Sequence, residues 1–207
     1  MLKNKNKLLI FTKSPVLGEV KTRLQPDYSE EQSLTVHKNL LLNTLTKTTA
    51  INGVDIELCC TPDRTTSFFM NCENNFPVAL SNQYGADLGE RMAFAFSVAL
   101  QKYENVVVIG TDCPDINEAY ISQAFASLAE NNAVIGPAVD GGYVLLGLRQ
   151  YSSKVFQNIS WGSGTVFVQT ENALNELSWS YKELDIMHDV DRPEDLQRYP
   201  ELLNETS

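Results

Sequence analysis

The centre of the chain reads NVVVIGTDCPD, residues 105–115. Four consecutive β-branched residues, Val106 to Ile109, predict a strand with both faces buried, as in a parallel sheet. Asp112 follows this strand after Gly110 and Thr111. In open α/β sheets, ligands gather at the carboxyl ends of the strands. The stretch therefore predicts a central strand followed by a carboxylate that can reach a ligand. The alternative is that Asp112 is a simple turn residue with no ligand.

Strand-like and helix-like stretches alternate on both sides of this centre. Short apolar runs rich in β-branched residues are typical of strands, and longer stretches with apolar residues three and four apart are typical of helices. The predicted strands are residues 7–12, 54–60, 76–80, 105–110, 133–138, 143–148 and 181–187. The predicted helices extend over residues 30 to about 49 and near 64–72, and apolar residues at helical spacing mark three more within 88–100, around 121–128 and around 166–177. This alternation predicts an α/β protein with a largely parallel sheet, and we expect one domain over residues 1–207.

Polar residues predict where several helices begin, because their side chains can accept a hydrogen bond from the first helical turn. Two of the motifs are predicted capping boxes, and a third places a proline in the first turn. The motifs are Ser29 with Gln32, Asp87, Asp115 with Glu118, Ser163, and Asp191 with Pro193 and Glu194. A capping role would be enough to explain the presence of Asp87, Asp115 and Asp191, without any contact with a ligand.

Composition excludes several classes of protein. The 207 residues are 43% hydrophobic and 20% charged, which is typical of a globular protein with a sizeable core. The net charge of -10 argues against a nucleic-acid partner. The four cysteines lack metal-site spacing, so neither a disulfide framework nor a structural zinc site is expected. We find no signal peptide and no membrane span, and we expect a cytoplasmic protein. Whether it forms a homo-oligomer is left open.

The charge is distributed unevenly. Residues 1–23 contain six basic residues and one acid, Glu19, which gives this segment a charge of +5 within an acidic chain. The loop after the first predicted strand carries Lys13, Gly18, Lys21 and Arg23. Such a loop can wrap a phosphate chain, although it matches neither a Walker loop nor a dinucleotide fingerprint. The alternative is a solvated basic loop.

A second acidic group lies near the C-terminus. Asp189 and Asp191 are two residues apart in an expected extended segment, so both carboxylates can face one side. Together with Asp112 they could complete a site for Mg2+ or Mn2+, which prefer oxygen ligands. His188 is expected to be a surface or packing residue rather than a ligand.

Three other segments are candidates for substrate contacts. Asp140 precedes two glycines in a predicted tight turn and could reach a substrate hydroxyl. Residues 85–91 hold two glycines at a helix start, which would allow a nucleoside to approach closely. Trp161 is a candidate cavity wall.

Five motifs in this order resemble the bacterial domain-of-unknown-function 2064 family, which belongs to the nucleotide-diphospho-sugar transferase (GT-A) superfamily. The resemblance covers about residues 9–196. The motifs are K-x-P-x-x-G-x-V-K-T-R-L (13–24), D-L-G-E-R-M (87–92), G-T-D-C-P (110–114), D-G-G-Y (140–143) and D-V-D-R-P-E-D-L (189–196). The resemblance implies a Rossmann-like three-layer α/β/α fold with a mostly parallel mixed sheet.

Two better understood groups of relatives are similar in parts of the chain. The 2-phospholactate guanylyltransferases have a first loop similar to Lys21 to Leu24, and sugar-activating cytidylyltransferases have a segment similar to Asp189 to Leu196. The chain lacks the G-G-x-x-x-R-M loop of most nucleotidyltransferases of this fold. The D-x-D of many sugar transferases is replaced by Asp112-Cys113-Pro114.

The resemblance also implies roles for individual residues. Asp112 would bind the metal, with Asp189 or Asp191 supplying the second carboxylate. The residues implied to bind the nucleotide are Lys13, Gly18, Lys21, Arg23, Asp87, Gly89 and Arg91.

The expected function is that of a metal-dependent transferase that moves a group from a nucleotide-activated donor to a small-molecule acceptor. The favoured donor is a nucleoside diphosphate sugar, and Asp112, Asp140 and Lys21 are the expected catalytic residues. One alternative is a nucleotidyltransferase that releases pyrophosphate. The other is a non-catalytic nucleotide-binding protein.

Overall fold

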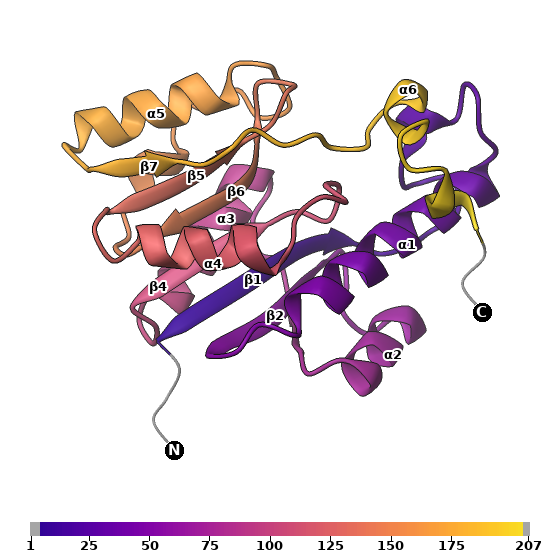
Figure 1. Cartoon of the computed structure of the whole chain (residues 1–207), viewed down its shortest axis with the longest axis horizontal. Helices are drawn as coiled ribbons and strands as arrows, with labels where there is room; N and C mark the ends of the chain where they lie inside the picture. Colours follow the sequence, from indigo (N-terminus) through magenta and orange to yellow (C-terminus); the bar gives the residue numbers. More distant parts are fainter. Residues whose placement is uncertain (1–4, 205–207) are drawn as a thin grey trace.

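The computed structural model describes residues 5–204 and contains a seven-stranded sheet in the order β3-β2-β1-β4-β6-β5-β7 (Figure 1). Only β6 runs antiparallel to its neighbours among these strands. The strands are β1 (Asn6–Lys13), β2 (Val54–Thr61), β3 (Ala79–Asn82), β4 (Asn105–Ile109), β5 (Ala133–Pro137), β6 (Tyr143–Leu148) and β7 (Tyr181–Glu183). The predicted mostly parallel mixed sheet is thus confirmed, with β4 near its centre.

Helices cover both faces of the sheet, which confirms the three-layer α/β/α architecture (Figure 1). Leu8 and Ile10 of β1 point toward the first face, and Leu9 and Phe11 point toward the second. The first face carries α1 (Glu30–Thr48), α2 (Ser67–Asn75) and α4 (Glu118–Ser127). The second carries α3 (Leu88–Ala99), α5 (Val166–Glu176) and the short helix η2 (Ser153–Phe156).

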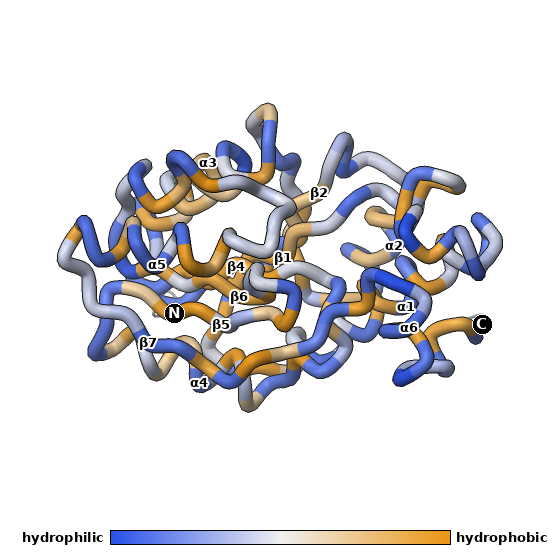
Figure 2. Tube along the Cα trace, turned by 90° about the horizontal axis from the view of Figure 1, so that it is seen from above, coloured by the Kyte–Doolittle hydropathy of each residue, from blue (hydrophilic) through white to orange (hydrophobic). Residues whose placement is uncertain are grey.

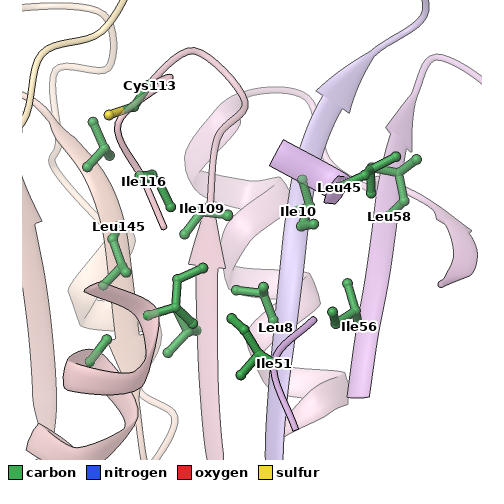
Figure 3. Close-up of a cluster of buried hydrophobic side chains, with 14 of the residues drawn as sticks. Leu8, Ile10, Leu45, Ile51, Ile56, Leu58, Ile109, Cys113, Ile116 and Leu145 are labelled. Carbon is green, nitrogen blue, oxygen red and sulfur yellow. The ribbon is translucent and has the colours of Figure 1, made fainter. Parts of the chain in front are cut away.

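The apolar residues gather where these layers meet. Figure 2 shows hydrophobic segments concentrated along the strands, with hydrophilic ones toward the outside. Figure 3 shows Ile10, Leu58 and Leu45 together in the cluster between the sheet and α1. Burial of this kind is the main favourable term in folding.

The C-terminal segment forms a third, smaller cluster against α1. It runs from β7 to the short helices α6 (Pro193–Leu196) and η3 (Pro200–Leu203), beside η1 (Thr22–Leu24) of the loop after β1 (Figure 1). We call this the strap cluster, and its buried members are Leu24, Val36, Leu40, Val190, Leu196 and Leu202. The loop after β1 and the C-terminal segment therefore pack together on one side of α1.

Two strand predictions were wrong in their bounds. The strand predicted at 76–80 begins at Ala79 because Pro77 has no N–H to donate to a ladder. The strand predicted at 181–187 ends at Glu183. Beyond it Leu184 N–H still donates to the Ile135 carbonyl at 2.9 Å, and an isolated bridge joins Ala138 with Met187. The short helix predicted at 64–72 lies at Ser67–Asn75, since Thr66 caps it.

Some of the predicted helix caps are confirmed and others were wrong. The Ser29–Gln32 capping box and the Asp87 cap are confirmed. Asp115 is not the cap of α4, because a turn closed by Ile116 N–H to the Cys113 carbonyl delays the helix until Asn117 can cap it.

The other two predicted caps were also wrong. Thr165, rather than Ser163, precedes α5, and Arg192, rather than Asp191, precedes α6. The Asp195 carboxylate accepts hydrogen bonds from the N–H groups of Asp191 and Arg192, which moves the start of α6 by one residue.

All four cysteines are free and buried. None of the helices in residues 5–204 is both long enough and apolar enough to cross a membrane. Lys3, part of the basic segment predicted at residues 1–23, lies outside the described residues.

Candidate functional site

A cavity of about 620 Å³ opens at the carboxyl ends of β1 and β4. Eight of the residues predicted to bind or react line it: Lys13, Lys21, Arg23, Arg91, Asp112, Asp140, Asp189 and Asp191. Gly18, Asp87 and Gly89 are not among its lining residues. The structure therefore brings together the predicted cations and carboxylates, which come from widely separated parts of the chain.

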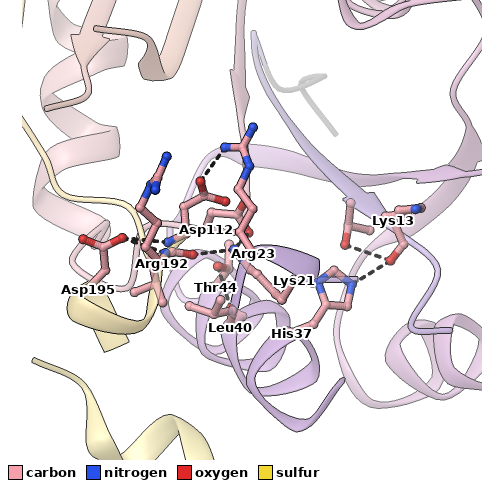
Figure 4. A network of polar contacts seen from close by, with 12 residues as sticks. Lys13, Lys21, Arg23, His37, Leu40, Thr44, Asp112, Arg192 and Asp195 are labelled. Atoms are coloured by element: carbon pink, nitrogen blue, oxygen red, sulfur yellow. Dashed lines mark hydrogen bonds and ion pairs between the residues drawn. The ribbon is translucent and has the colours of Figure 1, made fainter. Parts of the chain in front are cut away.

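Lys21 lies at the junction of three segments. Its backbone is left-handed, with φ 50° and ψ 37°, directly before η1. This turn directs the side chain inward, where it is only 5% exposed. Its Nζ lies 2.7 Å from Asp112 Oδ1 and donates a 2.6 Å hydrogen bond to the Val190 carbonyl (Figure 4). One ammonium thus joins the loop after β1, the loop after β4 and the C-terminal segment.

The other two predicted cations extend this arrangement. Arg23 Nη1 lies 2.6 Å from Asp191 Oδ2, and this hydrogen bond raises the pKa of Arg23 further above its ordinary value. Lys13 Nζ donates a 2.8 Å hydrogen bond to the carbonyl of Glu19 in its own loop. By contrast, Lys5 and Lys7 form ion pairs with Glu104 and Glu57 and do not line the cavity. Only part of the basic N-terminal segment therefore contributes to the site.

The carboxylates surround the same place. The Val190 N–H donates a 2.8 Å hydrogen bond to the Asp112 carbonyl, which brings Asp189 and Asp191 beside the loop after β4. Burial raises the pKa of Asp189, and the negative charges of Asp140, Asp112 and Asp191 raise it further. Asp112 remains 52% exposed despite its ion pair. Asp112 and Asp191 are paired with Lys21 and Arg23, whereas Asp140 and Asp189 form no ion pair with a cation of the described residues.

These carboxylates suit a hard divalent cation, because they are negatively charged and offer oxygen ligands. Within residues 5–204, no three His, Cys, Asp or Glu side chains are arranged to hold a metal by themselves. Mg2+ is often held by only one or two carboxylates, and substrate phosphates and water complete its coordination. Asp112 and Asp189 fit that pattern. The full set of Asp112, Asp189 and Asp191 stays a prediction, because Asp112 is paired with Lys21 and Asp191 is paired with Arg23.

Asp140 reaches the cavity through a close contact between two loops. Its Oδ1 accepts a 2.8 Å hydrogen bond from Gly142 N–H, which confirms the predicted turn. Gly141 has a φ of +87°, and a Cβ atom there would lie 2.2 Å from the Gly164 carbonyl oxygen. Phe167 N–H also donates to the Gly141 carbonyl at 3.0 Å. The turn can approach residues 164–167 this closely because position 141 is glycine.

The start of α3 forms part of the opposite wall. Asp87 Oδ1 accepts a hydrogen bond from Glu90 N–H at 2.8 Å, so capping explains this aspartate. Arg91 lines the cavity and donates from Nε to the Gly85 carbonyl at 3.1 Å. Gly89 packs against Trp161, which lines the cavity as expected. Roles for Asp87 and Gly89 in nucleotide binding stay predictions.

Sequence reasoning missed two residues beneath the loop after β1. His37 of α1 has Nε2 2.8 Å from the Lys13 carbonyl, and burial lowers its pKa (Figure 4). Gln83 donates from Nε2 to the carbonyls of Thr12, at 3.1 Å, and Cys59, at 2.7 Å. A histidine one residue after Val36 on the apolar side of a helix was an available signal. Nothing local distinguishes Gln83 from an ordinary loop glutamine.

Comparisons with known proteins add family and fold relationships. A family described as "Uncharacterized protein conserved in bacteria (DUF2064)" matches residues 44–163. A proposed nucleotide-diphospho-sugar transferase from Desulfovibrio desulfuricans G20 is 26% identical, with a TM-score of 0.84 and 97% of each chain covered.

More distant structures share the fold alone. A nucleotidyl transferase from Methanothermobacter thermautotroptrophicus has a TM-score of 0.62 at 11% identity, covering 97% of this chain and 98% of its own. A 4-diphosphocytidyl-2C-methyl-D-erythritol synthase from Anaerococcus prevotii DSM 20548 has a TM-score of 0.61 at 9% identity, covering 95% of each chain. No curated protein matches the chain.

Proposed function

Because the chain belongs to the DUF2064 family, with the predicted cations and carboxylates lining one cavity, we propose that it is a metal-dependent transferase. Its donor is a nucleotide-activated compound, a nucleoside diphosphate sugar, and its acceptor is a small molecule. The name of the Desulfovibrio desulfuricans protein supports the same class of donor.

One observation carries this proposal. Lys21 is paired with Asp112 at 2.7 Å, and Asp189 lies beside them with a pKa raised by burial and by neighbouring carboxylates. A diphosphate and a divalent cation bring complementary charges to such a place, since the phosphates meet the cations and the metal meets the carboxylates. A ligand without both groups would leave part of this charge unmatched.

The residues of the chain would divide the work as follows. Lys13, Lys21 and Arg23 would hold the phosphates and stabilise the charge that develops on the leaving diphosphate. Asp112 and Asp189 would hold Mg2+ or Mn2+, which supplies further charge neutralisation when bound. Asp140 would orient the acceptor hydroxyl and accept its proton.

The decisive variant is Asp112→Asn, which keeps the shape of the side chain and removes its charge. We expect Mg2+-dependent binding of UDP, GDP and their sugars to be lost with little change in the fold. In the wild type, a ligand present at about 100 times its Kd should add about 2.7 kcal/mol to stability, which is visible as a thermal shift.

The matched control is Asp27→Asn, because Asp27 is exposed and does not line the cavity. It should bind nucleotides as the wild type does. Metal-dependent binding that survives in Asp112→Asn would contradict the role of Asp112. Release of pyrophosphate from a nucleoside triphosphate by the wild type would instead identify nucleotidyl transfer.

A further inference from the structure

The two sides of the cavity differ in chemistry. The charged side is built by the loop after β1 and by the C-terminal segment. The other side is richer in apolar residues associated with α3, β6 and α5, and it also carries Arg91 and Asp140. Its apolar members are Leu88, Met92, Tyr143, Trp161 and Val166. A ligand that fits this cavity therefore combines a charged part with an uncharged part that has an apolar face.

Trp161 is the most firmly placed side chain of the apolar side. Its indole lies against α3, where a Cβ on Gly89 would come within 2.3 Å of Nε1. Its ring meets Tyr143 edge to face, at 6.4 Å between centroids and 88° between planes. The residue before it, Ser160, donates its N–H to Gln169 Oε1 of α5 at 2.7 Å. A half-buried tryptophan is thus held at the cavity from three directions.

The same loop is joined to the turn that carries Asp140. Gly164 packs against Gly141, and Phe167 N–H donates to the Gly141 carbonyl at 3.0 Å. Trp161 therefore belongs to the end of the cavity where the acceptor hydroxyl would be met. Thr61 and Gln83 line the cavity at the other end, near β2 and β3. A donor held by its diphosphate between these ends would place its nucleoside near Gln83 and its transferred group near Trp161.

We infer that Trp161 is the specificity-determining platform of the site, on which the sugar ring of the donor packs its C–H face. The inference rests on the proposed function and specifies its substrate class as a nucleoside diphosphate linked to an uncharged ring. Aromatic side chains suit this task because they offer a large apolar face at little cost in conformational entropy. Gly89 is then a positioning residue, since any larger side chain there would displace the indole.

The chain contains two tryptophans, which allows a direct measurement. Trp179 lies between α5 and β7 and does not line the cavity. In Trp179→Phe the fluorescence comes from Trp161 alone. With Mg2+ present, UDP-glucose or GDP-mannose should change this emission, and UDP or GDP should change it much less. Equal changes with the diphosphate and with its sugar would overturn the inference.

Binding to variants supplies the second measurement. In Trp161→Ala we expect the nucleotide sugar to bind about tenfold more weakly, while the Kd of the bare diphosphate changes by less than about twofold. Trp161→Phe, which keeps an aromatic face, should recover most of the loss. Gly89→Ala should also weaken binding of the nucleotide sugar, because its Cβ would displace the indole.

The outcomes separate the inference from the proposed function. If diphosphate and sugar lose affinity equally in Trp161→Ala, the ring on the indole is the nucleoside, and the inference is overturned while the transferase proposal stands. If the folded wild type binds neither diphosphates nor their sugars with Mg2+, the proposed function fails and the inference fails with it. Thermal unfolding of each variant without ligand shows whether that variant is folded at the temperature of the binding measurements.

Discussion

At the scale of single residues, His37 shows how burial fixes a protonation state beside the site. A carbonyl can only accept a hydrogen bond, so the 2.8 Å contact with the Lys13 carbonyl assigns a proton to Nε2. Burial is the main cause that lowers the pKa of His37, and the charges of Lys21 and Lys13 lower it further. The hydrogen bond to Lys13 and the charge of Asp112 oppose this shift. The folded protein therefore holds this imidazole neutral.

The consequence is a testable dependence of stability on pH. As pH falls below about 6.5, the unfolded chain binds a proton at residue 37 that the folded chain does not bind until its lower pKa. Stability from this residue is thus complete above pH 6.5 and decreases as pH falls toward the folded pKa. In His37→Gln we expect the slope of unfolding free energy against pH, from 7 to 5, to decrease by up to about 1.4 kcal/mol per pH unit.

Denaturant titrations at several pH values measure this slope. His188→Gln replaces the other histidine, which is exposed, and serves as the matched control. Identical slopes in the wild type and His37→Gln would show that the folded protein protonates His37 as readily as the unfolded chain does.

At the scale of elements, the start of α4 separates what local sequence decides from what packing decides. Asp115 and Asn117 are both good caps, and the spacing to Glu118 favours Asp115. The side chains of Cys113 and Ile116 are buried in the cluster between the sheet and α1, and their turn delays the helix by two residues. Asp115 instead accepts a 2.6 Å hydrogen bond from the Tyr199 hydroxyl. Periodicity predicted the helix, but only the tertiary packing of the turn fixes its first residue.

The cap can be tested by substitution. Asn117 Oδ1 accepts from Tyr120 N–H at 3.1 Å, so Asn117→Ala should lower the unfolding free energy by about 1 kcal/mol. Asn117→Asp keeps an acceptor and should lose much less. Urea denaturation measures both values. Equal losses in the two variants would mean that the cap hydrogen bond does not stabilise α4.

At the scale of the whole molecule, the site divides into a part that sequence could predict and a part that it could not. Asp112 and Lys13 follow strands, and the rule that ligands meet strand ends was enough to select them. The ion pair of Lys21 with Asp112 depends on a left-handed backbone and on a segment almost 170 residues away. Gln83 could not be predicted either, because its partners are carbonyls brought close by the pairing of β1 and β2.

The strap cluster links global packing to this site. It joins Leu24, next to Arg23, with Val190, which lies between Asp189 and Asp191. α1 contributes Leu40 to the strap cluster and Leu45 to the cluster against the sheet, and both side chains are fully buried. The same Leu→Ala substitution can therefore be made at two positions of α1, one in the strap cluster and one in the cluster against the sheet.

Leu40→Ala and Leu45→Ala should each lower the unfolding free energy by about 2–5 kcal/mol, because each leaves a cavity in a packed cluster. Only Leu40→Ala should also weaken Mg2+-dependent nucleotide binding, by about fivefold or more, since the loop and the C-terminal segment must then be ordered by the ligand. Chemical denaturation gives the stabilities, and calorimetry below the unfolding transition gives the Kd values. Equal binding by the two folded variants would show that the strap cluster stabilises the fold without positioning Lys21 and Asp189. A loss of nucleotide affinity in Leu40→Ala alone would show that packing in the strap cluster determines the geometry of the charged side of the cavity.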